Sequence, residues 1–116
     1  MQSNSSVKMT KAIVLDIEHL SQTTKEDRAL EAELLGLFQS QSREQLREIC
    51  RSALEKDAKG WKFALHTMKG MARALGAVTV AQVAEKLEKY SPGAGDIREL
   101  ELALAAVERE IFKRKG

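Results

Sequence analysis

The sequence predicts an all-α protein, an antiparallel up-down-up-down four-helix bundle with a short extra helix at its N-terminal end. Three observations support this prediction. Helix formers (Ala, Leu, Glu, Lys, Arg and Gln) dominate the composition, whereas β-branched residues are few and scattered. Apolar residues recur at spacings of three and four in four segments. The connections between these segments are short, and short connections make neighbouring helices antiparallel.

The composition also limits the function. The 116 residues suit a single domain, and the net charge of +2 is spread over interleaved acidic and basic residues, so we expect no nucleic-acid partner. We interpret the basic end KRKG as a helix terminus, where cations suit the macrodipole. No apolar run approaches the ~20 residues of a membrane span, and no signal peptide is visible. The single Cys50 excludes an internal disulfide and matches no zinc pattern, so we expect a cytoplasmic protein without a metal.

The N-terminal part is expected to contain a disordered arm over residues 1–12, before a bundle over residues 13–114. VLDIEHL (14–20) is apolar-periodic and predicts a short first helix. Thr23 and Thr24 are expected to cap the next helix, because Glu26 and Asp27 follow them at the spacing of a capping box.

The second segment has an apolar stripe that is broken by QSQS (39–42). QSQS contains no Pro or Gly, so one long helix with a polar segment in its middle is favoured. The alternative is two helices, the second starting at a capping box of Ser42 and Gln45. The stripe consists of Leu30, Leu34, Leu37 and Phe38 before QSQS, and Leu46, Ile49, Ala53 and Leu54 after it.

The third helix is predicted over residues 58–75, with Asp57 as its N-cap and Gly76 as the residue that ends it. Thr79 and Gln82 form a capping box for the fourth helix, with a hydrophobic staple of Val78 and Val83. This helix is expected to point Val80, Val83, Ala84 and Leu87 inward and to end before the loop SPGAG (91–95).

Asp96 and Glu99 are expected to cap the last helix. Its inward stripe is Leu100, Leu104, Val107 and Ile111.

The helix over residues 58–75 has two different faces. Its core stripe is Trp61, Leu65, Met68, Ala72 and Leu75. His66 lies off this stripe and is expected to face solvent. Residues three and four positions away share its face, and these are Lys62, Phe63, Lys69 and Gly70, with Arg73 one turn beyond.

Gly70 is an unusual choice for the interior of a helix, because glycine costs about 1 kcal/mol relative to alanine there. One explanation is a neighbouring helix that packs closely against it. The other is access: a missing side chain exposes the adjacent imidazole to a bulky partner. Access is favoured, because Gly70 lies on the face of His66 and not on the core face.

The surroundings of His66 suit a particular chemistry. A neutral imidazole nitrogen is a nucleophile that can carry a covalent group. A phosphoryl group brings nearly two negative charges, which Lys69 and Arg73 are placed to attract. His19 has no such surroundings and is interpreted as a surface residue of the first helix.

HTMKGMARALGA (66–77), with the helices on either side of it, resembles the histidine-containing phosphotransfer (HPt) domains of bacterial and fungal phosphorelays. The motif residues are His66, Lys69, Gly70, Gly76 and Ala77, and ELLGLFQSQSREQL (33–46) resembles the long helix that precedes them. The resemblance covers roughly residues 14–112. Its motif is weak alone but fairly specific inside a bundle pattern. Met71 departs from the family, which commonly has a small polar residue there.

The resemblance implies that His66 accepts a phosphoryl group from the aspartyl phosphate of a response-regulator receiver domain and passes it to another receiver. Its Nε2 should then face solvent. The domain would have no kinase activity and no cofactor of its own, since the receiver supplies magnesium. Receiver domains would be its partners, with a hybrid histidine kinase as a further one, and we expect a monomer.

The resemblance also assigns roles to the residues around His66. Lys69 and Arg73 would steady the phosphoryl group, and Gly70 would admit the receiver. Lys62 and Phe63 would form part of the docking surface. A polar residue of the next helix would orient the imidazole, and the candidates are Gln82, Glu85 and Glu88, with Glu85 or Glu88 favoured.

Two other functions stay open at this stage. The chain could be a helical adaptor that never carries phosphate, although its intact His66, Lys69 and Gly70 argue against this. It could also be the phosphate-accepting segment of a larger histidine kinase. A metal-dependent bundle hydrolase is disfavoured, because the sequence lacks the Glu-x-x-His motifs that such sites need.

Overall fold

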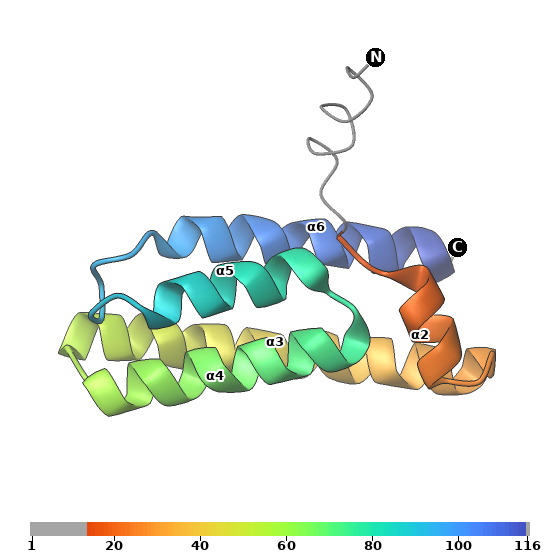
Figure 1. The fold of residues 1–116 in the computed structure, drawn as a ribbon, viewed down its shortest axis with the longest axis horizontal. Coiled ribbons are helices and arrows are strands. Elements are labelled where there is room, and N and C mark those ends of the chain that lie inside the picture. Colours follow the sequence, from red (N-terminus) through yellow and green to blue (C-terminus); the bar gives the residue numbers. More distant parts are fainter. Residues whose placement is uncertain (1–13, 116) are drawn as a thin grey trace, which may run out of the picture.

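The computed structural model describes residues 14–115, and within them the chain folds into five helices (Figure 1). A short α2 (Ile17–Thr23) precedes the four long elements α3 (Arg28–Glu55), α4 (Ala58–Leu75), α5 (Val78–Glu88) and α6 (Ile97–Lys115). The all-α prediction and the bundle are confirmed. The expected arm over residues 1–12 lies outside the described residues.

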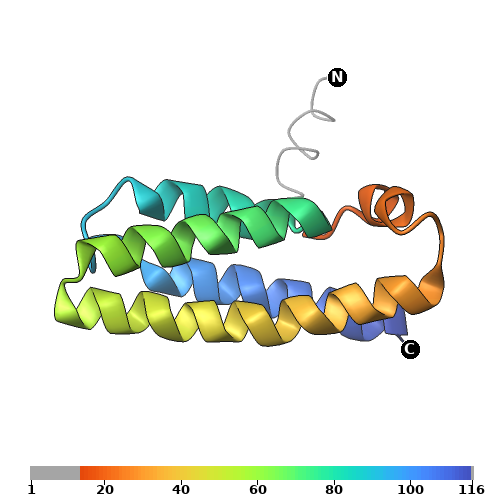
Figure 2. The ribbon, with the colours of Figure 1, turned by 90° about the horizontal axis from the view of Figure 1, so that it is seen from below.

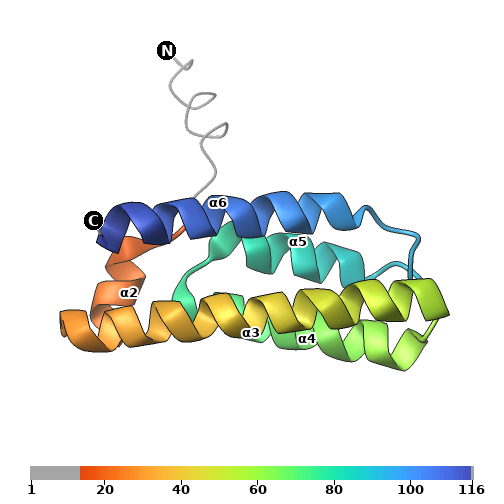
Figure 3. The ribbon, with the colours of Figure 1, turned by 180° about the vertical axis from the view of Figure 1, so that it is seen from behind.

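The four long helices pack in a ring in which each contacts two neighbours. α3 lies against α4, α4 against α5, α5 against α6, and α6 against α3 (Figures 2 and 3). α2 lies at one end of the bundle, where it contacts α4, and the chain then leads into the start of α3 (Figures 1 and 2). None of the described helices is both long enough and apolar enough to cross a bilayer.

The core confirms the predicted stripes of three helices. In α4 the buried side chains include Trp61, Leu65, Met68, Ala72 and Leu75. In α5 they include Val80, Val83, Ala84 and Leu87, and in α6 Leu100, Leu104, Val107 and Ile111. Each set recurs at helical spacing, so burial of a single face holds each helix in the bundle.

α3 is one continuous helix of 28 residues, as favoured, but it begins later than predicted. Its N-cap is Asp27, whose Oδ1 accepts hydrogen bonds from the N–H groups of Ala29 and Leu30 at 3.0 and 3.1 Å. The predicted caps Thr23 and Thr24 belong instead to the end of α2. The reason is the turn between the helices: Lys25 and Glu26 both adopt positive φ, which separates the end of α2 from the cap of α3.

The inward face of α3 also differs from the prediction. Leu30, Leu37 and Leu54 are 38%, 51% and 85% exposed, whereas Leu35 is buried. The buried face includes polar residues that a purely apolar stripe overlooks, namely Glu31, Ser42 and Ser52. The two serine hydroxyls donate to carbonyls of the preceding turn, so their burial leaves no polar group unpaired.

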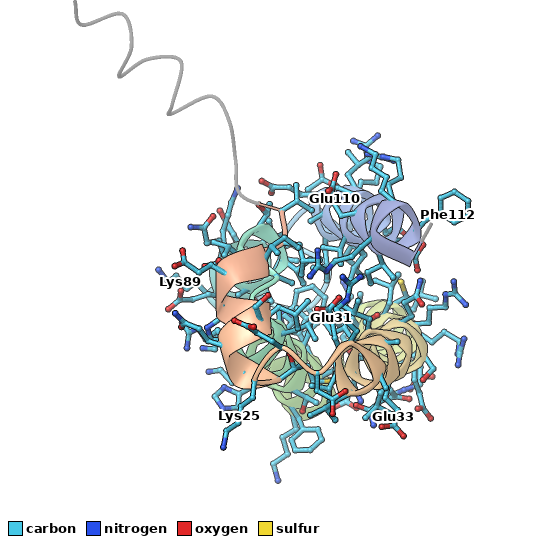
Figure 4. The ribbon with its side chains drawn as sticks, turned by 90° about the vertical axis from the view of Figure 1, so that its right-hand side faces the viewer. Lys25, Glu31, Glu33, Lys89, Glu110 and Phe112 are labelled. Carbon is cyan, nitrogen blue, oxygen red and sulfur yellow. The ribbon has the colours of Figure 1, made fainter. Side chains whose placement is uncertain are left out.

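Glu31 forms the main buried polar contact at one end of the bundle. Nε and Nη2 of Arg114 both donate to its carboxylate, the second at 3.0 Å, and the Glu31 side chain is only 4% exposed. Figure 4, which looks onto this end, shows Glu31 lying between the helices, whereas Phe112 points outward from α6. The hydrogen bonds from Arg114 lower the pKa of Glu31 from its ordinary value of 4.5.

The caps of α4 agree with the sequence analysis. Asp57 accepts from the N–H of Gly60 at 3.0 Å, and Gly76 ends the helix in the left-handed region, with φ 88°. The Gly60 N–H, together with the Arg51 guanidinium, lowers the pKa of Asp57. α4 is therefore fixed at both ends by local interactions.

The predicted capping box of α5 is wrong. The helix begins at Val78, and Ala77 is its N-cap without a side-chain hydrogen bond. The tight turn explains this, because the Ala77 N–H still bonds to Ala72 O at 2.8 Å while its own carbonyl accepts from Ala81 N at 3.1 Å. Thr79 therefore lies inside the first turn. At α6 the Oδ1 of Asp96 accepts from Arg98 N at 3.0 Å, in line with its predicted capping role.

Candidate functional site around His66

The position of α5 along α4 is set by a hydrogen bond at one end and by a short connection at the other. Trp61 is buried, and its Nε1–H donates to the carbonyl of Tyr90 at 3.0 Å just beyond the end of α5. At the other end the two helices are joined by only Gly76 and Ala77. The α4–α5 hairpin is thus fixed at both ends, and the last turn of α5 lies beside the middle of α4.

His66 lies on the outer face of α4, and its side chain is 72% exposed. Its Nδ1 is 3.3 Å from Oε2 of Glu88 on α5. A carboxylate only accepts hydrogen bonds, so Nδ1 must carry the proton for this contact to form. In the neutral ring Nε2 then bears a lone pair, and none of the residues in the described part of the chain forms a hydrogen bond with it.

Glu88 also binds Lys69. Its Oε1 accepts from Lys69 Nζ at 2.8 Å, and the two side chains are only 15% and 13% exposed. One carboxylate of α5 therefore holds the histidine and the lysine of the motif together. Of the three orienting candidates that the sequence left open, Glu88 is the one in contact with the imidazole.

The other two candidates lie elsewhere. Glu85 lies one turn before Glu88 in α5, and its Oε1 is 3.3 Å from Nη2 of Arg73; both side chains are about half exposed. Gln82 lines a different cleft, whose other lining residues include Arg73, Glu85 and His19. Arg73 therefore lies near the site with its charge already paired. Across the described residues, no group of three His, Cys, Asp or Glu side chains could hold a metal ion.

Gly70 faces open space. A Cβ built on it would meet no heavy atom within 4 Å. The packing explanation is therefore wrong, since no neighbouring backbone or side chain lies close enough to require a glycine. What remains is an exposed gap one turn from His66, on the same face of α4.

A shallow depression surrounds the imidazole toward the N-terminal end of α4. It is lined by Lys59, Lys62, Phe63, His66 and Glu88, and Phe63 is 72% exposed. Lys62 and Phe63 were predicted here from their spacing. Lys59 was missed, although it lies seven residues before His66 and so two turns away on the same face.

His19 lies at the surface of the first helix, as interpreted, and it also contacts the bundle. The residue is partly buried, and its Nε2 lies 3.1 Å from the carbonyl oxygen of Ala74 at the end of α4. Asp16 N donates to Gly76 O at 2.8 Å in the same region. His19 therefore helps to attach α2 to the bundle, which its local sequence could not show.

Residues 33–111 match the sequence model of the Hpt domain. The chain belongs to the Hpt domain family. The structure is similar to that of histidine-containing phosphotransfer protein B (HptB) from Pseudomonas aeruginosa PAO1, with a TM-score of 0.64, 27% sequence identity and 87% of each chain covered. No curated protein sequence matches the chain.

Family membership supports a histidine phosphotransfer role in a phosphorelay. Hpt domains are phosphocarrier modules and not kinases, and they interact with the receiver domains of response regulators. The exposed histidine beside Lys69 and Gly70 lies within the matched residues.

Proposed function

We propose that His66 accepts a phosphoryl group from the aspartyl phosphate of one receiver domain and passes it to the aspartate of another. The observation that carries this proposal is the pair His66–Glu88. When Nδ1 is held by a carboxylate, Nε2 is the single reactive nitrogen of this imidazole, whose side chain is 72% exposed.

The transfer requires no proton to leave or join Nε2, which is the attacking atom. The lone pair of Nε2 attacks phosphorus, the P–O bond to the acyl oxygen breaks, and the aspartate leaves as a carboxylate. Because Nδ1 keeps its proton, the phosphorylated ring carries a positive charge. The carboxylate of Glu88 stabilises that charge, and the same cationic ring is a good leaving group when the phosphoryl group moves on.

The neighbours of His66 have supporting roles in this scheme. Lys69 and Arg73 provide positive charge near the incoming phosphoryl group, although each is paired with a glutamate of α5 before it arrives. Gly70 leaves room for the partner, and the exposed ring of Phe63 provides apolar contact. The magnesium ion would come from the receiver domain, and the chain itself would supply no cofactor.

We further propose that residues 13–114 act as one monomeric unit in the cytoplasm. A single ring of four packed helices around one core supports the unit, because no described helix could bury its apolar face alone. The face around His66 must stay free of other copies to admit a receiver, including the receiver of a hybrid histidine kinase.

The direct test is labelling. The chain is incubated with receiver domains that have been phosphorylated by acetyl phosphate, and acid-labile phosphate on the chain is followed with time. We expect labelling of the wild-type chain and of His19→Gln, and none of His66→Gln. Both variants should keep the helical content of the wild type. An adaptor without phosphotransfer activity would show no label in any of the three.

A further inference from the structure

α4 has an unusual distribution of charge. Among its 18 residues are four cations, Lys59, Lys62, Lys69 and Arg73, and no Asp or Glu. A surface helix normally mixes both signs, and pairs of opposite charge three or four residues apart stabilise it. α4 contains no such pairs, so any ion pair to its cations comes from another element or from a partner.

Half of this charge is balanced within the bundle. Glu88 accepts from Lys69, and Glu85 accepts from Arg73, so α5 pairs the two cations at and beyond the site. Lys59 and Lys62 are exposed, and in the described part of the chain neither has an ion-pair partner.

The acidic residues close to these two lysines are already occupied. Glu88, the one carboxylate that lines the depression, binds both Lys69 and His66. Asp57, two residues before Lys59, accepts from Gly60 N–H and from Arg51 Nη2 at 3.0 Å each. The rim of the depression therefore has two free positive charges, beside the exposed ring of Phe63.

The helix fixes where these charges lie relative to His66. With a rise of 1.5 Å per residue, Lys62 is about 6 Å and Lys59 about 10 Å from His66 along the axis of α4. Both lie on the N-terminal side, opposite to Gly70. These spacings are within or close to the Debye length of about 10 Å at 0.1 M salt, so the two charges act together on a docking protein.

We propose that Lys59 and Lys62 select among receiver domains, favouring those with carboxylates at matching distances from the phosphorylated aspartate. This inference rests on the proposed function and names the partner's chemistry at the same site. Charges at the rim of an interface mainly accelerate association and reject partners of like charge. The lysines therefore act on encounter, while His66 and Glu88 act on the transfer step.

The test compares two double charge reversals of equal size. Lys59→Glu with Lys62→Glu alters the rim, whereas Arg109→Glu with Lys113→Glu makes the same change in net charge on α6. α6 packs on α3 and α5, across the bundle from α4, and Arg109 and Lys113 are both exposed. The donor is a receiver domain already shown to phosphorylate the wild-type chain, and transfer is measured as a second-order rate constant.

At about 0.01 M salt, where the Debye length is about 30 Å, the rim variant should transfer at least tenfold more slowly than the control variant. At about 1 M salt, where the length is about 3 Å, the two should agree within about twofold. The first-order rate at saturating receiver should stay within about threefold of the wild type. Equal rates for the two variants at low salt, or a loss that salt does not reduce, would overturn the inference.

A compensating change tests the partner's side. Acidic residues around the phosphorylated aspartate of the same receiver are replaced by lysine, one at a time. At least one replacement should slow transfer to the wild-type chain and restore transfer to the rim variant by fivefold or more. If no position restores transfer, the inference is contradicted.

The proposed function and this inference can fail separately. If no receiver labels wild-type His66, the proposed function itself fails, whereas labelling without these charge effects removes only the selection by Lys59 and Lys62.

Discussion

Glu88 holds His66 and Lys69 at once, with its two carboxylate oxygens 3.3 Å from Nδ1 of the imidazole and 2.8 Å from Nζ of the lysine. The lysine balances the carboxylate while the imidazole is neutral. When the ring is phosphorylated it becomes cationic and the phosphoryl group adds negative charge. The carboxylate can then pair with the ring and release Lys69 toward the phosphoryl oxygens. The three residues thus form one electrostatic unit, which the following variants test.

Glu88→Gln should slow phosphoryl transfer to His66 about tenfold, which corresponds to about 1.4 kcal/mol in the activation barrier. The amide can still accept a hydrogen bond from Nδ1 but no longer stabilises a positive ring. Glu85→Gln is the matched control on the same helix, because it removes an equal charge whose one ion pair among the described residues is with Arg73. Its transfer rate should stay within about twofold of the wild type. Equal losses in both variants would show a general effect of charge.

Lys69→Met should lower the free energy of unfolding by about 1–2 kcal/mol as well as slow transfer. Exposed ion pairs contribute at most about 1 kcal/mol, but this pair is largely buried, and its loss leaves the Glu88 carboxylate without a cation. The double variant Lys69→Met/Glu88→Gln should be less destabilised than the sum of the single variants. If the losses in the free energy of unfolding, measured by urea denaturation, are strictly additive, the two side chains do not interact.

Gly70→Ala should raise the free energy of unfolding by up to about 1 kcal/mol, because the new methyl group enters open space and the cost of glycine in a helix is removed. Gly70→Gln should also fold well but transfer phosphate at least tenfold more slowly, since its side chain would stand beside the imidazole. Melting temperature and transfer rate are measured on both variants.

Gly36 provides the control for this pair. A Cβ on it also meets nothing within 4 Å, and it lies on α3 away from the residues that line the depression at His66. Gly36→Ala and Gly36→Gln should therefore be as stable as their Gly70 counterparts and transfer phosphate normally. A slow Gly36→Gln variant, or a fast Gly70→Gln variant, would contradict the access role of Gly70.

Stability should fall in acid because of Glu31. Arg114 depresses the pKa of its carboxyl in the folded protein below the ordinary value of 4.5. The stabilisation is therefore present in full above pH 4.5 and is lost as the pH falls through the folded value. Chemical denaturation from pH 7 to pH 3 should show a weaker pH dependence for Glu31→Gln than for the wild type. Glu33→Gln, which changes an exposed carboxyl of the same helix, should keep the wild-type profile.

The sequence alone determined much of the fold and which residues share the outer face of α4 with His66. Helical periodicity placed the core stripes of α4, α5 and α6, since burial on a single face repeats with the helix itself. Asp57 and Gly76 marked the ends of α4 by local chemistry. The group His66, Lys69, Gly70 and Arg73 was visible because residues three and four apart share a face of any helix.

Tertiary structure decided the features that depend on two elements meeting. The inward face of α3 includes Glu31, which periodicity of apolar residues cannot identify, because its burial depends on Arg114 at the far end of the chain. Glu85 and Glu88 are equally plausible partners of His66 in the sequence. The axial offset of α5 against α4, set by the two-residue turn after α4 and by the bond from Trp61 to Tyr90, brings Glu88 to the imidazole and leaves Glu85 with Arg73. Periodicity fixes which side chains share a face, but only packing between helices fixes which turn of one helix lies beside which turn of another.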